Sequence, residues 1–183
     1  ATMVSNQAPN PNYAEGSVFF VRSDRKDLDS IASLKDKSVS ANYPFAFSGW
    51  QIAAGELMKR GFDPDHFFSK MDFLGHGAAP VIDAVMSGKT DAGIVRACVL
   101  ENAGLIKSGK VKVLEPKETT DFPCEVCTRL YPNWTLSTTP NTPPEISRKV
   151  TAAVLEIKPL QNNLHWSVAT DFTPIDDLFK QLQ

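Results

Sequence analysis

Between residues 17 and 114, short apolar runs alternate with segments of helical periodicity, and this alternation limits the fold more than any other feature. Apolar runs bounded by glycine or charged residues are typical of buried strands. We predict strands at residues 17–21, 37–41, 71–74, 91–95 and 111–114. We predict a helical turn at 30–34 and helices at 48–60, 78–86 and 98–106. Short connections between such elements favour an α/β fold with a mostly parallel sheet and flanking helices.

The amino-acid composition changes after this region. Residues 119–144 contain five prolines, which predicts a connection and not a packed element. Residues 145–157 then carry one apolar stripe at helical spacing, formed by Ile146, Val150, Val154 and Ile157. A last short helix is predicted at residues 174–182.

The balance of charge excludes several classes of function. Nineteen basic and twenty-one acidic residues give a net charge of −2. Non-specific binding to nucleic acid or to a membrane surface requires an excess of positive charge, which this composition lacks. No apolar run approaches the roughly 20 residues of a membrane-spanning helix. The chain begins with Ala1 and shows no signal peptide, which we interpret as a mature or excised segment.

The segment from Tyr43 to Trp50 follows a predicted strand and begins a predicted helix. Ligands of open α/β sheets bind where strands end, and the unpaired N–H groups of a helix start suit an anion. Gly49 lets the backbone approach a ligand closely. We therefore predict ligand contacts from Tyr43, Phe47, Ser48, Gly49 and Trp50. The alternative is that Ser48 only caps the helix and the phenylalanines belong to the core.

His76 lies in a second turn between a strand and a helix, flanked by Gly75 and Gly77. An imidazole there can donate a hydrogen bond to an oxyanion. The competing interpretation is a solvated histidine or a helix cap. Neither His66 nor His165 has surroundings that favour a site.

The three cysteines leave several pairings open. Cys98 follows the fourth predicted strand, and Cys124 and Cys127 form a C-x-x-C. One disulfide with a free thiol and three free thiols are both compatible with this count. A redox C-x-x-C normally precedes a helix that lowers the pKa of its thiol, and here a proline-rich connection follows. Three cysteines and a distant histidine are a poor zinc site.

No further motif indicates catalysis. The sequence contains no phosphate-binding Walker loop, no nucleophile elbow, no zinc-protease helix and no dinucleotide-binding glycine motif. Asn133-Trp134-Thr135 fits a glycosylation sequon. With no nucleophile, base and orienting group assembled in sequence, we predict a protein that is not an enzyme and that has no cofactor, metal or catalytic residue.

Several of these segments resemble the phosphonate-type periplasmic binding proteins. Residues 17–25 and 31–39 are similar to the beginning of the second lobe of that family. Phe47-Ser48-Gly49-Trp50 resembles its anion-binding turn, and Gly75-His76 with residues 84–93 resembles its next strand-helix-strand unit. The resemblance implies a type II-like α/β lobe of a periplasmic protein that binds a small anion.

A narrower resemblance is to the extracytoplasmic sensor domain of tetrathionate-sensor histidine kinases. Residues 91–102, Phe122-Pro123-Cys124, residues 128–134 and Leu164-His165-Trp166 carry it. This resemblance implies that Cys98 and Cys124 form a disulfide or redox pair. It also implies a sensor of a sulfur oxyanion or phosphonate-like anion in two-component signalling, joined to the membrane only by a neighbouring segment. The alternative is the substrate-binding protein of a phosphonate or phosphate ABC transporter.

The family fold has two lobes, and its first lobe precedes segments like these. The resemblance therefore implies a leading loop at residues 1–14, the second lobe at 15–118 and a hinge or return connection at 119–144. Helices within 145–183 would pack on the first lobe. Without that lobe they would expose apolar faces or pair with a second copy of the chain as a homodimer.

Overall fold

The computed structural model describes residues 1–5, 13–118, 122–159 and 164–183, and the chain forms two compact units. The larger unit comprises Gly16–Thr119, Cys124–Arg129 and Leu178–Gln183. The smaller unit comprises Ala1–Glu15, Thr120–Pro123 and Leu130–Asp177. The site predicted from the sequence lies entirely in the larger unit, so the two units are treated separately.

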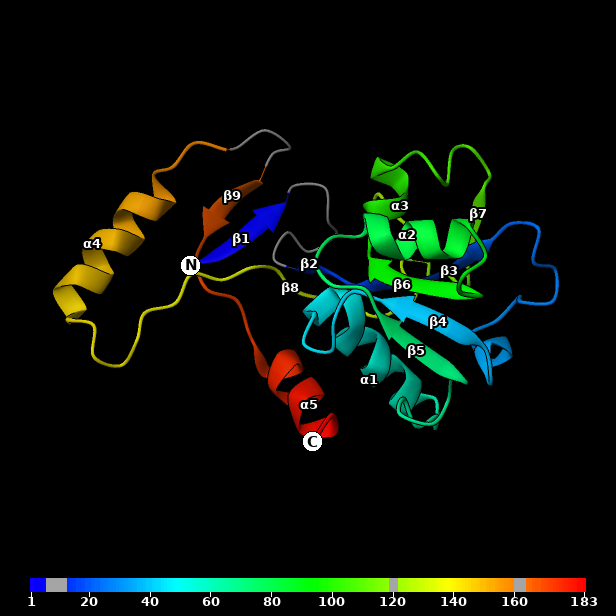
Figure 1. Cartoon of the computed structure of the whole chain (residues 1–183). Helices are drawn as coiled ribbons and strands as arrows, with labels where there is room; N and C mark the ends of the chain where they lie inside the picture. The colour runs from blue at the N-terminus through cyan, green and yellow to red at the C-terminus, as the bar shows by residue number, and fades with distance from the viewer. Residues whose placement is uncertain (6–12, 119–121, 160–163) are drawn as a thin grey trace. The chain divides into compact units, whose positions relative to one another are not determined.

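A five-stranded sheet forms the centre of the larger unit, with the order β5-β4-β6-β3-β7 (Figure 1). The strands are β3 (Ser17–Arg22), β4 (Ser38–Ala41), β5 (Lys70–Phe73), β6 (Ala92–Arg96) and β7 (Val111–Val113). β4 pairs in parallel with β5 and β6, whereas β3 runs antiparallel to both β6 and β7. The predicted α/β class with a mostly parallel sheet is confirmed, and β3 is the strand that departs from it.

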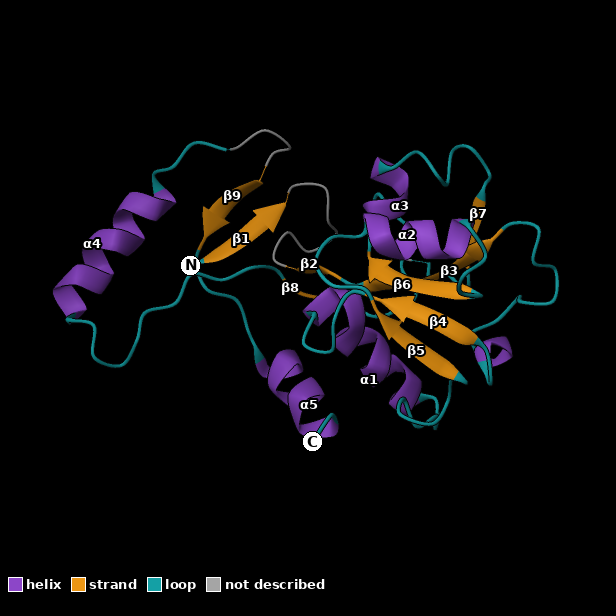
Figure 2. Ribbon diagram, viewed as in Figure 1, coloured by secondary structure: helices purple, strands orange, loops and turns teal. Residues whose placement is uncertain are grey.

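Helices cover both faces of this sheet (Figure 2). α1 (Ile52–Lys59) connects β4 to β5, and α2 (Ala79–Met86) connects β5 to β6. The chain steps outward from β4 to β5 and then back across β4 to β6, so right-handed crossovers put the two helices on opposite faces. Phe19, Phe20 and Ile94 are fully buried between these layers.

The predicted helix at 98–106 is wrong in its length. α3 is a single turn, Val99–Asn102, because Gly104 follows with a left-handed φ of 69°. Such a residue ends a helix, and here the helix ends about one turn before residue 106, its predicted end. The helical turn predicted at 30–34 is the short 3-10 helix Ala32–Leu34.

The smaller unit contains strands where we predicted loop. β1 (Thr2–Ser5) lies within the predicted leading loop, and it pairs antiparallel with β9 (Leu164–Ser167). β2 (Tyr13–Glu15) pairs with β8 (Tyr131–Pro132), which lies within the predicted connection. These strands are short and their partners are distant in sequence, so periodicity could not reveal them. The rest of the predicted leading loop, residues 6–12, lies outside the described residues.

α4 (Pro144–Leu155) carries the apolar stripe predicted for this segment. None of its residues is buried, and Ile146, Val150 and Leu155 are exposed. α5 (Thr173–Gln181) begins in the smaller unit, and its second half, from Leu178, belongs to the larger one. Leu178 is buried there against Gly55 of α1, where an added Cβ would lie 2.2 Å from the leucine Cδ1. Within the described residues, no helix has the length and apolarity needed to cross a bilayer.

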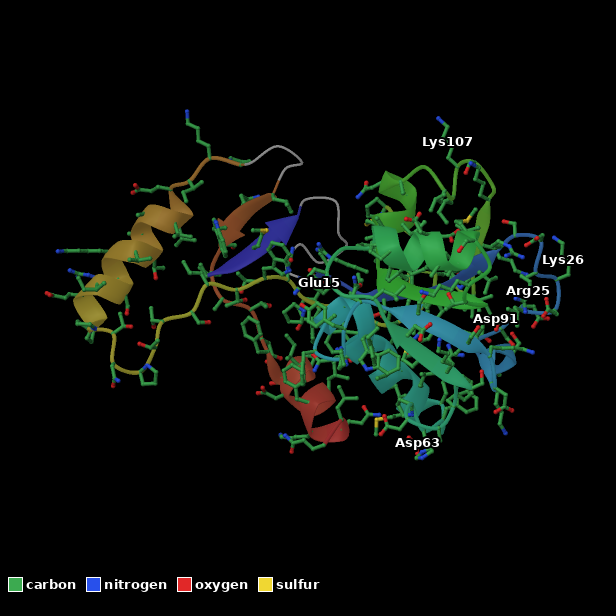
Figure 3. The ribbon with its side chains drawn as sticks, viewed as in Figure 1. Glu15, Arg25, Lys26, Asp63, Asp91 and Lys107 are labelled. Atoms are coloured by element: carbon green, nitrogen blue, oxygen red, sulfur yellow. A yellow bond between two sulfur atoms is a disulfide. The ribbon has the colours of Figure 1, made fainter. Side chains whose placement is uncertain are left out.

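An ion pair joins two loops at the edge of the sheet where β4 and β6 begin. Arg25 Nη1 lies 2.6 Å from Asp91 Oδ1, and Figure 3 shows the two side chains together. The other carboxylate oxygen of Asp91 accepts hydrogen bonds from the Ser38 amide at 2.9 Å and hydroxyl at 2.7 Å. Burial alone would raise the pKa of Asp91, but the bonds from Arg25 and Ser38 lower it below the ordinary value.

We expect Asp91→Asn to lower the free energy of unfolding at neutral pH by about 1–2 kcal/mol, since charge-assisted bonds are lost from a partly exposed group. Because the folded-state pKa is depressed, this contribution is present above the unfolded pKa and disappears as pH falls through the folded one. Urea unfolding across acidic pH measures it. Asp24→Asn, in the exposed pair with Arg22, is the matched control. An equal loss in both variants, or a loss independent of pH, would contradict the assignment.

Candidate functional site

The predicted anion-binding turn begins with a π-helical turn. Phe47–Gln51 forms this turn directly before α1, and Ala46, not Ser48, is the residue that precedes the first helical turn. The Trp50 and Gln51 amides both donate to the Ala46 carbonyl, at 2.9 and 3.0 Å. The N–H groups of Ser48 and Gly49 thus come before the first helical hydrogen bonds, where helix donors have no intrahelical acceptor. The interpretation of Ser48 as a simple N-cap is wrong, since no side chain caps this helix.

Asn42, which was not predicted as a site residue, contacts both the His76 turn and the turn that contains Gly49. Its side-chain nitrogen donates to the carbonyls of Gly77 at 2.6 Å and Gly75 at 3.3 Å. Its side-chain oxygen lies close to Gly49, where an added Cβ would be 2.4 Å away. Asparagine at the end of a strand is a weak signal in sequence, because such residues are common in turns.

His76 and Tyr43 lie together at the ends of β5 and β4. Their ring centroids are 4.7 Å apart, and His76 is exposed. Gly75 and Gly77 both have left-handed φ values, 88° and 83°, so the backbone can turn sharply on each side of the histidine. Two segments that are far apart in sequence therefore place an imidazole beside a phenol.

Trp50 and Phe47 have packing partners within the larger unit. Trp50 is 9% exposed, and its ring lies 5.5 Å from Phe73 and 6.4 Å from Phe68. Phe47 is half-buried and meets Phe179 of α5 edge to face, with centroids 6.0 Å apart. The contact of Phe47 supports its core interpretation, whereas that interpretation is wrong for Phe45, which is 80% exposed. The roles of Phe47 and Trp50 as ligand contacts stay predictions.

The antiparallel strand β3 starts at the same sheet edge where β4, β5 and β6 end. Ser17 at its start pairs with Arg96 at the end of β6. The Ser17 hydroxyl donates to the Ser48 carbonyl at 2.7 Å, and the Ser17 amide donates to the Thr128 hydroxyl at 3.1 Å. The first residue of β3 therefore supports the candidate turn. In an all-parallel sheet, the start of β3 would lie at the opposite edge.

Cys98 and Cys124 form a disulfide, as the narrower resemblance implied. Cys98 follows β6 with a left-handed φ of 70°, and its Cα lies 5.1 Å from that of Cys124. The bond fastens the segment Cys124–Arg129 to the edge of the sheet that carries the candidate turns.

Cys127 is the remaining free thiol, and it is buried. Its sulfur donates to the Leu114 carbonyl at 3.0 Å and accepts from the Phe19 amide at 3.2 Å. Burial raises the pKa of this thiol to about 12. Cys124 is bonded to Cys98, and Cys127 is buried, so the C-x-x-C does not form an accessible redox pair in this structure.

Two other sequence features have structural explanations. The side chain of Asn133 in the sequon is buried, and its oxygen accepts the Trp134 amide at 2.8 Å, so it is not accessible for glycosylation. Among the residues that the structure describes, no three His, Cys, Asp or Glu side chains are arranged to hold a metal ion.

The chain belongs to a family of periplasmic substrate-binding proteins of ABC transporters. Residues 2–177 match the family profile described as "ABC transporter, phosphonate, periplasmic substrate-binding protein". This match confirms the broader of the two resemblances. Members of the family are substrate-binding proteins and not enzymes. No curated protein matches the chain.

Solved structures show the same fold at low sequence identity. A Xanthomonas citri protein bound to ATP has a TM-score of 0.70 at 13% identity, and the alignment covers 98% of this chain and 68% of that one. A Prochlorococcus marinus protein in complex with methylphosphonate has a TM-score of 0.67 at 17% identity, with coverages of 99% and 71%. A binding component of a phosphonate transporter from Pseudomonas aeruginosa has a TM-score of 0.61 at 18% identity, with coverages of 98% and 62%.

These structural neighbours are type II periplasmic binding proteins, so the predicted fold type is confirmed. The chain spans between 62% and 71% of the length of these three relatives.

We expect removal of the Asn42 side chain to loosen the His76 turn without unfolding the sheet. Two hydrogen bonds worth about 1 kcal/mol each hold that turn, so Asn42→Ala should raise amide exchange roughly tenfold or more at Leu74 and Gly75, whose amides donate to the Ala41 and Asn42 carbonyls at 2.9 and 2.7 Å. Hydrogen exchange followed by mass spectrometry or NMR measures this. Asn102→Ala, at the end of α3, is the control. Unchanged exchange at Leu74 and Gly75 would show that Asn42 does not organise the turn.

We expect the double variant Cys98→Ser with Cys124→Ser to lose about 3 kcal/mol of stability, because the disulfide closes a loop in the unfolded chain. Urea unfolding of the variant and of the dithiothreitol-treated parent should agree. Reductant should leave the double variant unchanged. A parent protein whose unfolding curve is the same with and without reductant would contradict a structural role for the bond.

Proposed function

We propose that the chain binds a small phosphonate-like anion as part of the substrate-binding protein of an ABC transporter in the periplasm. The observation that carries the proposal is the meeting of two turns at one sheet edge: the Asn42 side chain bonds the Gly75-His76-Gly77 turn, and its oxygen lies beside Gly49 at the start of the π-helical turn. Sheet edges of this kind are where open α/β folds bind ligands. The family match and the fold likeness to a methylphosphonate complex favour the transporter interpretation over the sensor one.

The chemistry of the two turns suits an oxyanion. The Ser48 and Gly49 amides precede the first helical hydrogen bonds, and the partial positive charge of a helix start favours an anion beside them. The Tyr43 hydroxyl and the His76 imidazole add two further donors that lie close to each other. None of these groups carries a full fixed charge, so we propose that hydrogen-bond geometry more than net charge selects the ligand.

A second candidate is the sensor domain of a histidine kinase that detects a sulfur oxyanion such as tetrathionate. The specific observation in its favour is the Cys98–Cys124 disulfide, because the narrower resemblance implied that pairing. The sequence of the gene beyond Gln183 distinguishes the two candidates. A transmembrane helix followed by a kinase supports the sensor, and a stop codon supports the transporter.

We also propose that the larger unit is the second lobe of a two-lobed binding protein. Residues 15–118 would supply that lobe, 119–144 the return connection and α4, within 145–183, a helix that packs on a first lobe. α5 departs from the predicted arrangement, because its buried Leu178 packs against Gly55 of the larger unit. The exposed apolar side chains of α4 and the additional length of the structural relatives support this division. Binding by such a protein would close the lobes around the anion.

Isothermal titration calorimetry with methylphosphonate, phosphate, thiosulfate and tetrathionate tests the anion site. We expect one anion to bind and His76→Ala to weaken it about tenfold, since a charge-assisted hydrogen bond is lost. Gly49→Ala should weaken binding at least as much, because the added Cβ would meet Asn42 at 2.4 Å.

His66→Ala is the matched control, since His66 is exposed in another loop and bonds Asp63 at 2.7 Å. Its anion affinity should equal that of the parent. A higher affinity for tetrathionate than for methylphosphonate would favour the sensor candidate. Absence of binding to all four anions, or an equal loss in the two histidine variants, would overturn the proposed site.

A further inference from the structure

A cavity of about 380 Å³ opens on the larger unit beside α1. It runs from the loop before the π-helical turn, at Phe45, past Trp50 and Met58 to the loop after α1. Tyr43, Ser48 and His76, the polar residues proposed to bind the anion, do not line it. Its volume lies in the range of about 300–1,000 Å³ that is usual for small-ligand pockets.

The last residues of α5 and those after it form a firmly held wall of this cavity. Leu182 lines the cavity, and Gln181 Nε2 donates to the Gly55 carbonyl of α1 at 3.4 Å. Leu178 is 2% exposed and fills the space over Gly55. Phe179 meets Phe47 on the adjoining turn. The cavity therefore lies between α1 and the end of α5, which pack together through the buried Leu178.

The opposite end of the cavity is acidic. Asp63 and Asp65 line it, and no lysine or arginine is among its described lining residues. The Asp63 carboxylate is fixed in place, because it accepts the Asp65 amide at 3.0 Å and bonds the His66 ring at 2.7 Å. The bond with His66 also lowers the pKa of Asp63, so the carboxylate is ionised at neutral pH. Figure 3 shows Asp63 at the far end of α1.

We propose that this cavity binds a small organic cation, an ammonium group with an apolar body. Aromatic walls attract ammonium groups through their π faces, and Trp is the strongest of these side chains. Phe45 and Trp50 supply aromatic rings, Met58 and Leu182 supply apolar surface, and the two carboxylates supply the opposite charge. The cavity shares Trp50 with the predicted anion contacts, and it has the opposite charge preference.

The charge pattern decides between a cation and a neutral apolar ligand. A neutral ligand would contact the apolar walls but would have no electrostatic attraction to the carboxylates. An ammonium group gains the same contact together with attraction to the two carboxylates, which are exposed. An anion would be repelled by both aspartates. The cation is therefore the ligand class that uses every part of the lining.

Titration of the full chain with choline, followed by NMR or calorimetry, tests the proposal. We expect a dissociation constant of about 1 mM or below, which is typical of one ammonium group on a partly open aromatic site. The neutral isostere 3,3-dimethylbutan-1-ol should bind about tenfold more weakly, since it has the same shape and no charge. Residues whose signals shift should include Phe45 and Trp50.

Substitutions locate the binding. Asp65→Asn should weaken choline about threefold to fivefold, and the double change with Asp63→Asn about tenfold. Phe45→Ala should weaken it about fivefold, and the fold should tolerate this change because Phe45 is 80% exposed. Asp29→Asn makes the same charge change at an exposed residue outside the cavity and should have no effect. No binding of choline, equal binding of the neutral isostere, or affinity unaltered by the cavity variants would overturn the proposal.

Discussion

The side-chain amide of Asn42 is the interaction on which the candidate site depends. It is the first residue after β4, and it binds the backbone on both sides of His76 while it occupies the space beside Gly49. Asn42 thus fixes the His76 turn by hydrogen bonds and packs beside the start of the π-helical turn. An anion bound by backbone amides needs those amides in fixed positions, so we expect Asn42 to influence the proposed site although it is not itself a proposed ligand contact.

The reversal of β3 serves the same edge of the sheet. In an all-parallel sheet, only the C-terminal ends of the strands would lie at the edge that carries the candidate turns, and a loop would follow each of them. Since β3 runs the other way, its first residue reaches that edge and the Ser17 hydroxyl supports the Ser48 carbonyl. The disulfide fastens the returning chain to the end of β6. Support for the candidate turn therefore comes from three segments that are distant in sequence.

The sequence predicted the elements of the larger unit well, because their apolar runs and helical stripes are local properties. The β4-to-α1 turn and the His76 turn were both placed correctly between a strand and a helix. The direction of β3 and the strands of the smaller unit were missed, since each depends on a partner more than sixty residues away. Asn42 was missed for a related reason: its role exists only when Gly49 and Gly77 are brought beside it. The part of α3 predicted beyond Asn102 is absent, because Gly104 has a positive φ and ends the helix there.

Two ion pairs of the larger unit lie outside the candidate turns: Arg25 with Asp91 at the edge where β4 and β6 begin, and Lys117 with the buried Glu56 of α1. The residues proposed to contact the anion are instead backbone amides, a phenol and an imidazole. Neutral donors act over short distances and only in fixed directions, whereas a full positive charge attracts any anion from afar. A site of this kind distinguishes oxyanions by the spacing of their oxygens, which is the property that separates a phosphonate from a chain-like sulfur oxyanion of similar charge.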